Sequence, residues 1–403
     1  MNTFAEMAQP GVSFTQQIID ISRREKPTAL PVFIGYSDVE DVQGELTAVS
    51  SLQEFYNLFG QQPSGRGYLL DAMRLYFAHG GGRCHVLALT SGDEGPVAQD
   101  YDGIADIIAN EPDITLLVLP DIVLLDSESW RQVVNDVGQC CAENLNLFAL
   151  IDYPSAPQDA ESYRQLNIGP YGMHMAGYWP WVIFEEDAAM RLRQPRRLSM
   201  SRAVPPSAAV AAAMQGNDKM RGVWKAPANI RLDKVIKPAY DHYTRVKMFF
   251  ADPRQGCSVN QIRSFPGRGI KIWGCRTLSM RNDVSQLYVQ NQRLLKWIKI
   301  TLSEAMRPYV YEPNNEITWY RVHALIRSRL KALWERGGLA GATEEEAYQI
   351  SVGRDDYMDE NDVENGLLRC RVSVAIQQPV EFIHINLDLF LGQGRVEHGG
   401  AAL

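Results

Sequence analysis

Two predominantly apolar runs separated by one amphipathic helix constrain the fold of this chain most strongly. The runs are ITLLVLPD at 114–121 and LFALIDYP at 147–154, and SESWRQVVNDVGQCCAEN at 127–144 between them has helical periodicity. A continuously apolar strand is typical of a parallel sheet that helices cover on both faces. Parallel neighbours also need a crossover of a dozen or more residues, which this helix supplies. The pattern therefore predicts a β-α-β unit inside a mixed α/β fold.

The residues before this unit follow the same alternation of strand and helix. LPVFIGYSD at 30–38 is expected to be the first core strand, and RCHVLALT at 83–90 is expected to be a later one. SSLQEFYNLFG predicts a helix with Ser50 or Ser51 as its N-cap and Gly60 at its C-terminal end. The apolar face of a second helix, in YLLDAMRLYFAHGGG, should consist of Leu69, Met73, Tyr76 and Phe77.

The second half of the chain has a different character. The segment 204–229 begins with two prolines, which disfavour helix at the preceding residue, and continues with a short Ala-rich helix. That helix is expected to end at the turn residues Gly216, Asn217 and Asp218. Longer amphipathic helices are expected at about 285–306 and 316–336. Half-buried strands are expected at 348–356, 367–379 and 380–390.

Composition and charge argue against several classes of function. A chain of 403 residues with 45% hydrophobic content can bury two cores. Its net charge of −8 argues against nucleic acid or an anionic membrane as the main partner. Its most apolar run is interrupted at Pro120-Asp121 and is too short to span a bilayer, and the N-terminus lacks a targeting pattern. Six cysteines without a C-x-x-C pair indicate synthesis in a reducing cytoplasm.

Three segments contain residue types that are typical of active sites. HGGG at 79–82 can supply oxyanion-hole amides, but no G-x-S-x-G nucleophile accompanies it, so we interpret it as a helix terminator. Asp121 and Asp152 follow the two parallel strands, where ligands often bind, yet capping or loop hydrogen bonds are the favoured interpretation. The acidic loop at 353–366 lacks the register of a calcium loop, and the histidines lack ligand spacing. We therefore predict no catalytic residue, no cofactor and no metal site.

Four segments in a fixed order carry a family resemblance. The first combines PGVSF, LPVFIGYSD and SLQEFYNLFG; the second is YLLDAMRLYFAHGGGRCHVLAL, and the third is the segment 204–229. The fourth combines FPGRGIKIWGCRTLS, LYVQNQRLLKWIKITL and VYEPNNEITWYRV. Together they resemble the contractile sheath proteins of phage tails and phage-tail-like injection particles. The chain departs from that pattern at Ala208, where the family has glycine, and residues 93–171 carry little of the signature.

The resemblance implies a two-domain sheath subunit with extended terminal arms. Such subunits stack as rings around an inner tube, and each lends its arms as strands to the sheets of neighbouring subunits. The expected arm strands contain Val12, Phe14, Ile18, Ile19, Ile385, Leu387 and Leu389. The expected division is an arm with the start of an inner assembly domain at 1–31, an outer α/β domain at 32–203, a linker at 204–229, the inner domain at 230–382 and an arm at 383–403.

The resemblance also implies partners and a mechanism without catalysis. The partners are further copies of this chain, the inner tube protein, baseplate and terminal cap proteins and, where they exist, sheath paralogues. Contact with the tube should be weak, and exposed ion pairs suit it because each contributes about 0–1 kcal/mol. The cations expected to face the tube are Arg321, Arg327, Lys331 and Arg336. The other charged face considered carries Arg293, Lys296 and Lys299.

Other interpretations of the sequence remain open. An α/β hydrolase-like enzyme could use the edge near His79 or Asp121, and a minor ring at the baseplate or cap would keep the same fold. The arms could also fold back onto their own domain. The expected location is the bacterial cytoplasm during synthesis and an assembled tail or tail-like particle afterwards.

Overall fold

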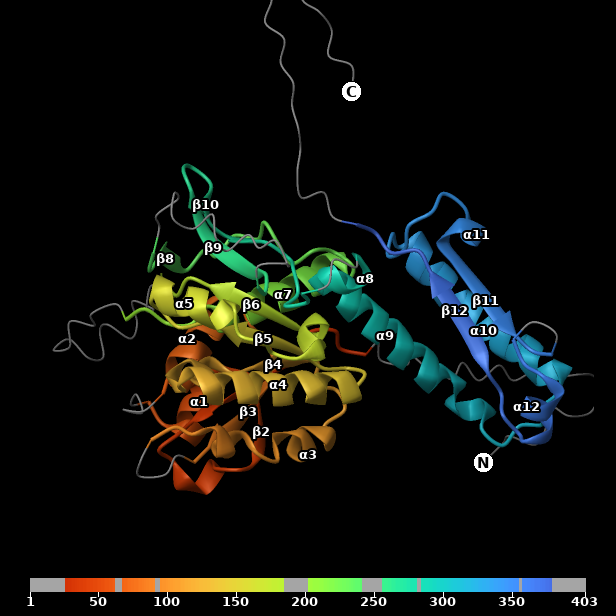
Figure 1. Cartoon of the computed structure of the whole chain (residues 1–403), viewed down its shortest axis with the longest axis horizontal. Helices are drawn as coiled ribbons and strands as arrows, with labels where there is room; N and C mark the ends of the chain where they lie inside the picture. The colour runs from red at the N-terminus through yellow and green to blue at the C-terminus, as the bar shows by residue number, and fades with distance from the viewer. Residues whose placement is uncertain are drawn as a thin grey trace, which may run out of the picture.

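A computed structural model describes residues 26–61, 67–90, 95–184, 202–240, 256–280, 284–354 and 357–378. Most of these residues form one large sheet domain, and the C-terminal helices and strands lie to one side of it (Figure 1). The expected arm strands at 12–21 and 383–391 lie outside the described residues.

An eight-stranded mixed sheet organises the sheet domain. Its strand order is β10-β9-β6-β5-β4-β1-β3-β2, and the six strands from β9 to β3 run parallel. The two outermost strands, β2 and β10, pair antiparallel to β3 and β9. The bounds are β1 Pro31–Tyr36, β2 Leu46–Val49, β3 Cys84–Leu89, β4 Leu116–Val118, β5 Phe148–Asp152, β6 Met175–Trp179, β9 Val259–Phe265 and β10 Gly269–Trp273.

Helices cover both faces of the sheet, which explains why most residues of its central strands are apolar. Phe33 of β1 faces the core formed with α1, α2 and α7, whereas its neighbours Val32 and Ile34 face the core formed with α3, α4 and α5. Successive strand residues point to opposite faces, so a strand covered on both sides has few polar positions. The helix bounds are α1 Leu52–Phe59, α2 Leu69–Ala78, α3 Ile104–Ala109, α4 Ser127–Glu143, α5 Pro157–Arg164 and α7 Ser207–Arg221.

Several local predictions are confirmed. β4, α4 and β5 form the predicted β-α-β unit, with Leu117 opposite Ala149 in a parallel register. Ser51 is the N-cap of α1, since its side chain accepts a hydrogen bond from Glu54 N. Gly60 ends α1 with a φ of 81°, a conformation in which glycine avoids the Cβ clash of other residues.

The segment 204–229 differs from the predicted linker. Its helix α7 runs through Gly216, Asn217 and Asp218 to Arg221, so the predicted end was wrong. The turn residues are tolerated because packing holds the helix: its Ala-rich face is buried against the sheet, and Asn217 Nδ2 donates to Lys225 O at 3.1 Å. Strands β9 and β10 were assigned to the inner domain, but β9 pairs with β6 of the α/β domain, and β10 pairs with β9. The large sheet therefore crosses the expected boundary.

The C-terminal elements form a smaller unit beside the sheet domain. We call α9 Val289–Met306, α10 Glu316–Glu335, β11 Tyr348–Val352 and β12 Cys370–Val374 the C-terminal module, together with the short helices α11 Glu344–Ala347 and α12 Glu360–Glu364. The predicted helix at 285–306 is divided into α8 Val284–Leu287 and α9, because Tyr288 forms a bridge with Arg276. A separate two-stranded sheet joins β7 Val182–Phe184 and β8 Val235–Pro238. No helix within the described ranges combines the length and apolarity needed to cross a membrane.

Candidate functional site

The carboxyl edge of the parallel sheet is filled by its own side chains. Asp121 lies directly after β4, where the strand order reverses, and this is the usual ligand crevice of an open α/β sheet. Its carboxylate is fully buried and accepts hydrogen bonds from Tyr36 N at 2.7 Å and Tyr68 N at 2.5 Å. A Cβ on Gly35 or Gly67 would come within 2.5 or 2.7 Å of the same carboxylate. The crevice is thus closed by packing.

Asp152, at the end of β5, is also a hydrogen-bond acceptor with a structural role, like Asp121. Its carboxylate accepts hydrogen bonds from the Ser207 amide at 3.1 Å and from the Ser207 hydroxyl, so it fixes the first turn of α7. Burial raises the pKa of Asp121 to about 7 and that of Asp152 to about 8. The predicted loop and capping hydrogen bonds of both carboxylates are confirmed.

The HGGG stretch ends α2 and leads into β3. His79 is the C-cap of α2, and its Nδ1 lies 2.9 Å from Leu75 O. Gly81 packs against the ring of Tyr76, where a Cβ would approach to 2.5 Å. The Gly82 amide donates to Gln215 Oε1 at 2.6 Å. This amide therefore already binds a side chain of α7, and the interpretation as a helix terminator is confirmed.

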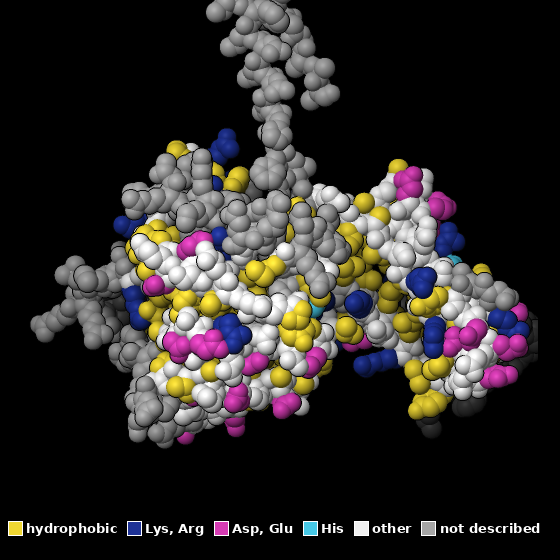
Figure 2. All heavy atoms as spheres, in the orientation of Figure 1, with side chains coloured by type: hydrophobic (Ala, Val, Ile, Leu, Met, Phe, Trp, Pro, Cys, Tyr) yellow, Lys and Arg dark blue, Asp and Glu magenta, His cyan; other side chains and the backbone are white. Residues whose placement is uncertain are grey.

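The acidic loop at 353–366 uses its described carboxylates for capping and ion pairs. Asp359 caps α12, Glu360 lies 3.4 Å from Arg354, and Asp362 lies 3.0 Å from Arg369. Among the residues that the structure describes, no group of three His, Cys, Asp or Glu side chains is arranged to hold a metal ion. The Asp and Glu side chains of this region gather around α12 at the far end of the module (Figure 2).

The C-terminal module has a one-sided core. Val322, Ile326, Leu330 and Leu333 of α10 are buried, as the predicted stripe required, and they pack with α9 and one face of the β11–β12 sheet. β11 pairs with β12 in antiparallel register, with Ile350 opposite Val372. In the described part of the chain this sheet has two strands, so each strand has one edge without a strand beside it. Such edges present backbone N–H and C=O groups to an additional strand.

The predicted tube-facing cations are not equivalent. Arg327 Nε lies 2.7 Å from Glu344 Oε1, and Lys331 Nζ lies 3.9 Å from Glu344 Oε2. Tyr348 donates its hydroxyl to the same carboxylate, and these partners, Arg327 first, lower the pKa of Glu344 to about 2. Arg336 lies instead over the ring of Trp224, 5.3 Å from its centroid. The structure thus brings Arg327 and Lys331 together around one acid, whereas Arg336 contacts an aromatic ring.

Two of the three cations on the other charged face that the sequence offered, Arg293 and Lys296, are buried, whereas Lys299 is exposed. Arg293 Nη2 and Asp218 Oδ2 form an ion pair at 2.5 Å, with side chains 3% and 2% exposed. Lys296 Nζ donates to Cys141 O at 2.5 Å, at the C-terminal end of α4. Burial lowers the pKa of Lys296 to about 8. These two residues fix the base of α9 to the sheet domain and cannot face a tube.

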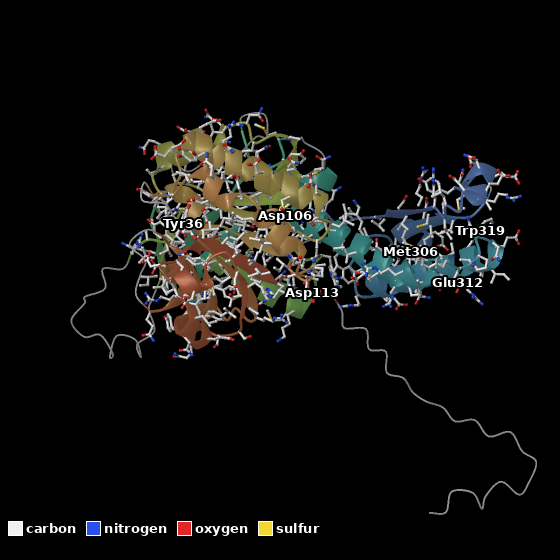
Figure 3. The ribbon with its side chains drawn as sticks, turned by 90° about the horizontal axis from the view of Figure 1, so that it is seen from below. Tyr36, Asp106, Asp113, Met306, Glu312 and Trp319 are labelled. Carbon is white, nitrogen blue, oxygen red and sulfur yellow. The ribbon has the colours of Figure 1, made fainter. Side chains whose placement is uncertain are left out.

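A hydrophobic patch at the far end of the module was missed by the sequence reasoning. Tyr311 and Tyr320 are 101% and 76% exposed, and Val310 and Ile317 are 61% and 62% exposed. Tyr311 also has a φ of 74°, which is uncommon outside glycine. We call these four residues the tip patch; Figure 3 shows Glu312 and Trp319 of the same region, distant from the sheet domain. Ile317 and Tyr320 lie outside the apolar stripe of α10. Their position off the stripe is the feature of the sequence that could have predicted the tip patch.

Comparison with known proteins gives one consistent result. No protein-family model matches this chain, and no curated protein matches it, whereas solved structures match nearly its whole length. A chain of the anti-feeding prophage (AFP) baseplate in contracted state is 30% identical with a TM-score of 0.80, and the match covers 96% of this chain and 99% of that one.

Two further structures are sheath assemblies. A chain of the PVC sheath complex, an extracellular contractile injection system in contracted state, is 28% identical with a TM-score of 0.73, covering 95% of this chain and 98% of that one. A chain of the AFP helical sheath in contracted state is also 28% identical with a TM-score of 0.73, covering 94% and 98%.

Proposed function

Because the chain belongs to the contractile sheath proteins of phage tails and extracellular injection systems, we infer that its function is structural: it polymerises around an inner tube and contracts. The observation that carries this conclusion is the match over nearly the full length of both chains to a sheath in the contracted state. The filled crevice at Asp121 and the bonded Gly82 amide support a subunit without catalysis.

Neighbouring subunits are proposed to be joined through strand exchange at the β11–β12 sheet. Its two edges are available among the described residues, and the arm sequences have alternating apolar residues that suit an added strand. The donated strands would contain Val12, Phe14, Ile18 and Ile19 at one chain end. At the other end they would contain Ile385, Leu387 and Leu389. Main-chain hydrogen bonds would keep subunits connected while they rotate and slide.

Contraction is proposed to be driven by larger subunit contacts in the contracted state. Burial of about 400 Å² more apolar surface per subunit would release about 10 kcal/mol. Summed along a tube, this free energy can drive the tube through a target envelope without nucleotide hydrolysis. The exposed tip patch is a described surface that such contacts could bury.

The proposed partners include the inner tube, the baseplate and cap proteins, and sheath paralogues. The solvent-exposed side of α10 is proposed to contact the tube through Arg321, Arg327, Lys331 and Arg336. Because Glu344 already pairs with Arg327 and Lys331, an acidic tube residue would have to share or replace Glu344. Such a contact would be weak, as a breakable attachment requires. We further propose that the module faces the tube and the sheet domain faces outward.

The experiment that tests the function is electron microscopy of the purified full-length protein over a range of concentrations, beside a variant lacking residues 1–20. Striated hollow tubes from the full chain, lost on deletion, are expected. Monodisperse full-length subunits, even when tube and baseplate proteins are added, would contradict the main-sheath function. A ring that forms only with baseplate or cap proteins would instead identify a minor sheath paralogue.

A further inference from the structure

Helix α9 joins the C-terminal module to the sheet domain, and its two ends are attached in different ways (Figure 1). At the first two turns of α9, Arg293 and Asp218 form an ion pair whose side chains are 3% and 2% exposed. Arg293 Nη2 also donates to Thr28 O at 2.9 Å, and Lys296 Nζ donates to Cys141 O. Breaking a buried ion pair by removing one partner is strongly destabilising, so this end of α9 is firmly fixed.

The loop after α7 strengthens the same attachment. Trp224 packs into the core of the module, and Arg336 of the module lies over its ring at 5.3 Å from the centroid. Asn217 Nδ2 of α7 donates to Lys225 O at 3.1 Å and so holds this loop close to Asp218. The apolar and the ionic contacts therefore lie together. We call Asp218, Trp224, Arg293 and Lys296 the pivot.

The far end of α9 is joined to the sheet domain by a bridging lysine. Lys26 Nζ lies 2.8 Å from Asp113 Oδ1 of the sheet domain and 3.1 Å from Glu304 Oε1 of α9. Asp113 lies on the side of the sheet domain that faces the module (Figure 3). The hydrogen bond to Asp113, followed by that to Glu304, raises the pKa of Lys26, so its ammonium group is charged at neutral pH. We call Lys26, Asp113 and Glu304 the latch.

The latch and the pivot differ in exposure and in packing. The side chains of Lys26, Asp113 and Glu304 are 24%, 45% and 36% exposed, and exposed ion pairs add little stability and are screened by salt. A cavity of about 130 Å³ between α9 and α10 adjoins Lys26 and Glu304, whereas the cavity beside Arg293 and Lys296 measures about 10 Å³. Because close packing resists displacement, the latch can open at a lower cost than the pivot.

We propose that the latch sets the angle of the module relative to the sheet domain and that its release lets the module turn about the pivot. Glu304 lies about 16 Å beyond Arg293 along α9, so the latch holds the module well away from the point about which it turns. This inference rests on the proposed function, in which the module connects subunits that rotate and slide. With the latch closed, a free subunit presents the β11–β12 sheet in one orientation. With the latch open, that sheet follows a neighbouring subunit while the pivot stays intact.

The test measures the distance between the two regions in the dilute full-length protein. Paramagnetic labels are attached through non-canonical amino acids at Gln132 of α4 and Ala324 of α10, which are both exposed. Pulsed electron paramagnetic resonance should give a narrow distance distribution for the unmodified chain and one at least twofold wider for Lys26→Met. The matched control Lys299→Met, at an exposed lysine of α9, should leave the distribution unchanged. A distribution that is already wide in the unmodified chain, no widening in Lys26→Met, or an equal widening in Lys299→Met would overturn the proposal.

Salt and thermal unfolding separate the latch from the pivot. In the unmodified chain, about 1 M NaCl shortens the Debye length to about 3 Å and should widen the distribution as Lys26→Met does. The unfolding midpoint of Lys26→Met should stay close to that of the unmodified chain, whereas Asp218→Ala should lower it strongly. A distribution that is insensitive to salt would overturn the proposal, as would a fall of the midpoint in Lys26→Met equal to that in Asp218→Ala.

These measurements use dilute subunits and do not depend on tube formation. Failure of the unmodified chain to form tubes would contradict the proposed sheath function, and the distance distributions would still decide whether the latch fixes the module.

Discussion

The sheet domain and the C-terminal module differ in how completely their sheets are covered. In the sheet domain helices cover both faces, and even the ligand crevice is filled by Asp121. The module has two strands covered on one face, exposed strand edges among the described residues, and the exposed tip patch. Helices cover both faces of the first sheet, whereas the sheet of the module is covered on one face within the described residues. We propose that the sheet domain is the stable body of the subunit and that the module connects neighbouring subunits.

The largest effect on stability is expected from Trp130→Ala in the sheet domain. Trp130 is fully buried on α4 and packs edge-on or tilted against Tyr153 and Tyr163, with ring centroids 5.3 and 5.2 Å away. Its truncation should lower the free energy of unfolding by about 3–5 kcal/mol. Chemical denaturation measures this, and Leu145→Ala, at a 45% exposed residue beyond the end of α4, should change it by less than about 0.5 kcal/mol. Equal losses of stability in Trp130→Ala and Leu145→Ala would contradict the conclusion that the core of the sheet domain stabilises the subunit.

A comparable effect is expected where the two regions are joined. Asp218→Ala leaves Arg293 buried without its carboxylate, which should cost about 3–5 kcal/mol. The double variant Asp218→Leu/Arg293→Met should recover much of that loss, because it removes the unpaired charge. Thermal unfolding of the two variants measures the difference. A double variant as unstable as Asp218→Ala would show that the ion pair is not what holds α9.

The two regions should respond to pH with opposite signs. Burial raises the folded-state pKa of Asp121 to about 7 and that of Asp152 to about 8, so the stability they contribute is fully present below about pH 4 and is lost as pH rises through 7–8. In the module, Arg327 lowers the pKa of Glu344 to about 2, so this contribution is present above about pH 4.5 and is lost as pH falls towards 2.

Variants separate the two contributions to the pH dependence. Asp152→Asn should flatten the decline in stability between pH 4 and 8, and Glu344→Gln should change only the acidic end of the profile. Denaturation midpoints measured from pH 3 to 9 show how stability depends on pH in the neutral range and in the acidic range. A profile of Asp152→Asn identical to that of the unmodified protein would show that Asp152 is ionised in the fold throughout this range.

The smallest effect on subunit stability is expected from the tip patch. Tyr320→Ala and Ile317→Ser remove exposed side chains and should change the free energy of unfolding by no more than about 0.5 kcal/mol. Tube formation should nevertheless be weakened if these residues are covered by a partner in the assembled sheath. Sedimentation of tubes at matched concentrations measures this, with Met220→Ala, at a 79% exposed residue of α7, as the control. Equal sedimentation of all variants would exclude the patch as a contact.

The sequence predicted the parts of this structure that depend on local patterns. Apolar runs located β4 and β5, Ser51 and Gly60 marked the ends of α1, and the stripe of α10 gave its buried face. The end of α7 was missed because burial against the sheet outweighs the turn preference of Gly216, Asn217 and Asp218. The partners of Arg293 lie 75 and 265 residues away, at Asp218 and Thr28. Spacing alone could not show that this cation is buried.

We propose that neighbouring subunits complete the β11–β12 sheet. Hydrogen–deuterium exchange at 348–352 and 370–374, compared between dilute subunits and assembled tubes, tests it most directly. The predicted result is a large gain of protection at these two strands on assembly, with little change at β4 and β5, which are already fully paired and buried. Unchanged exchange at β11 and β12 in assembled tubes would contradict the account.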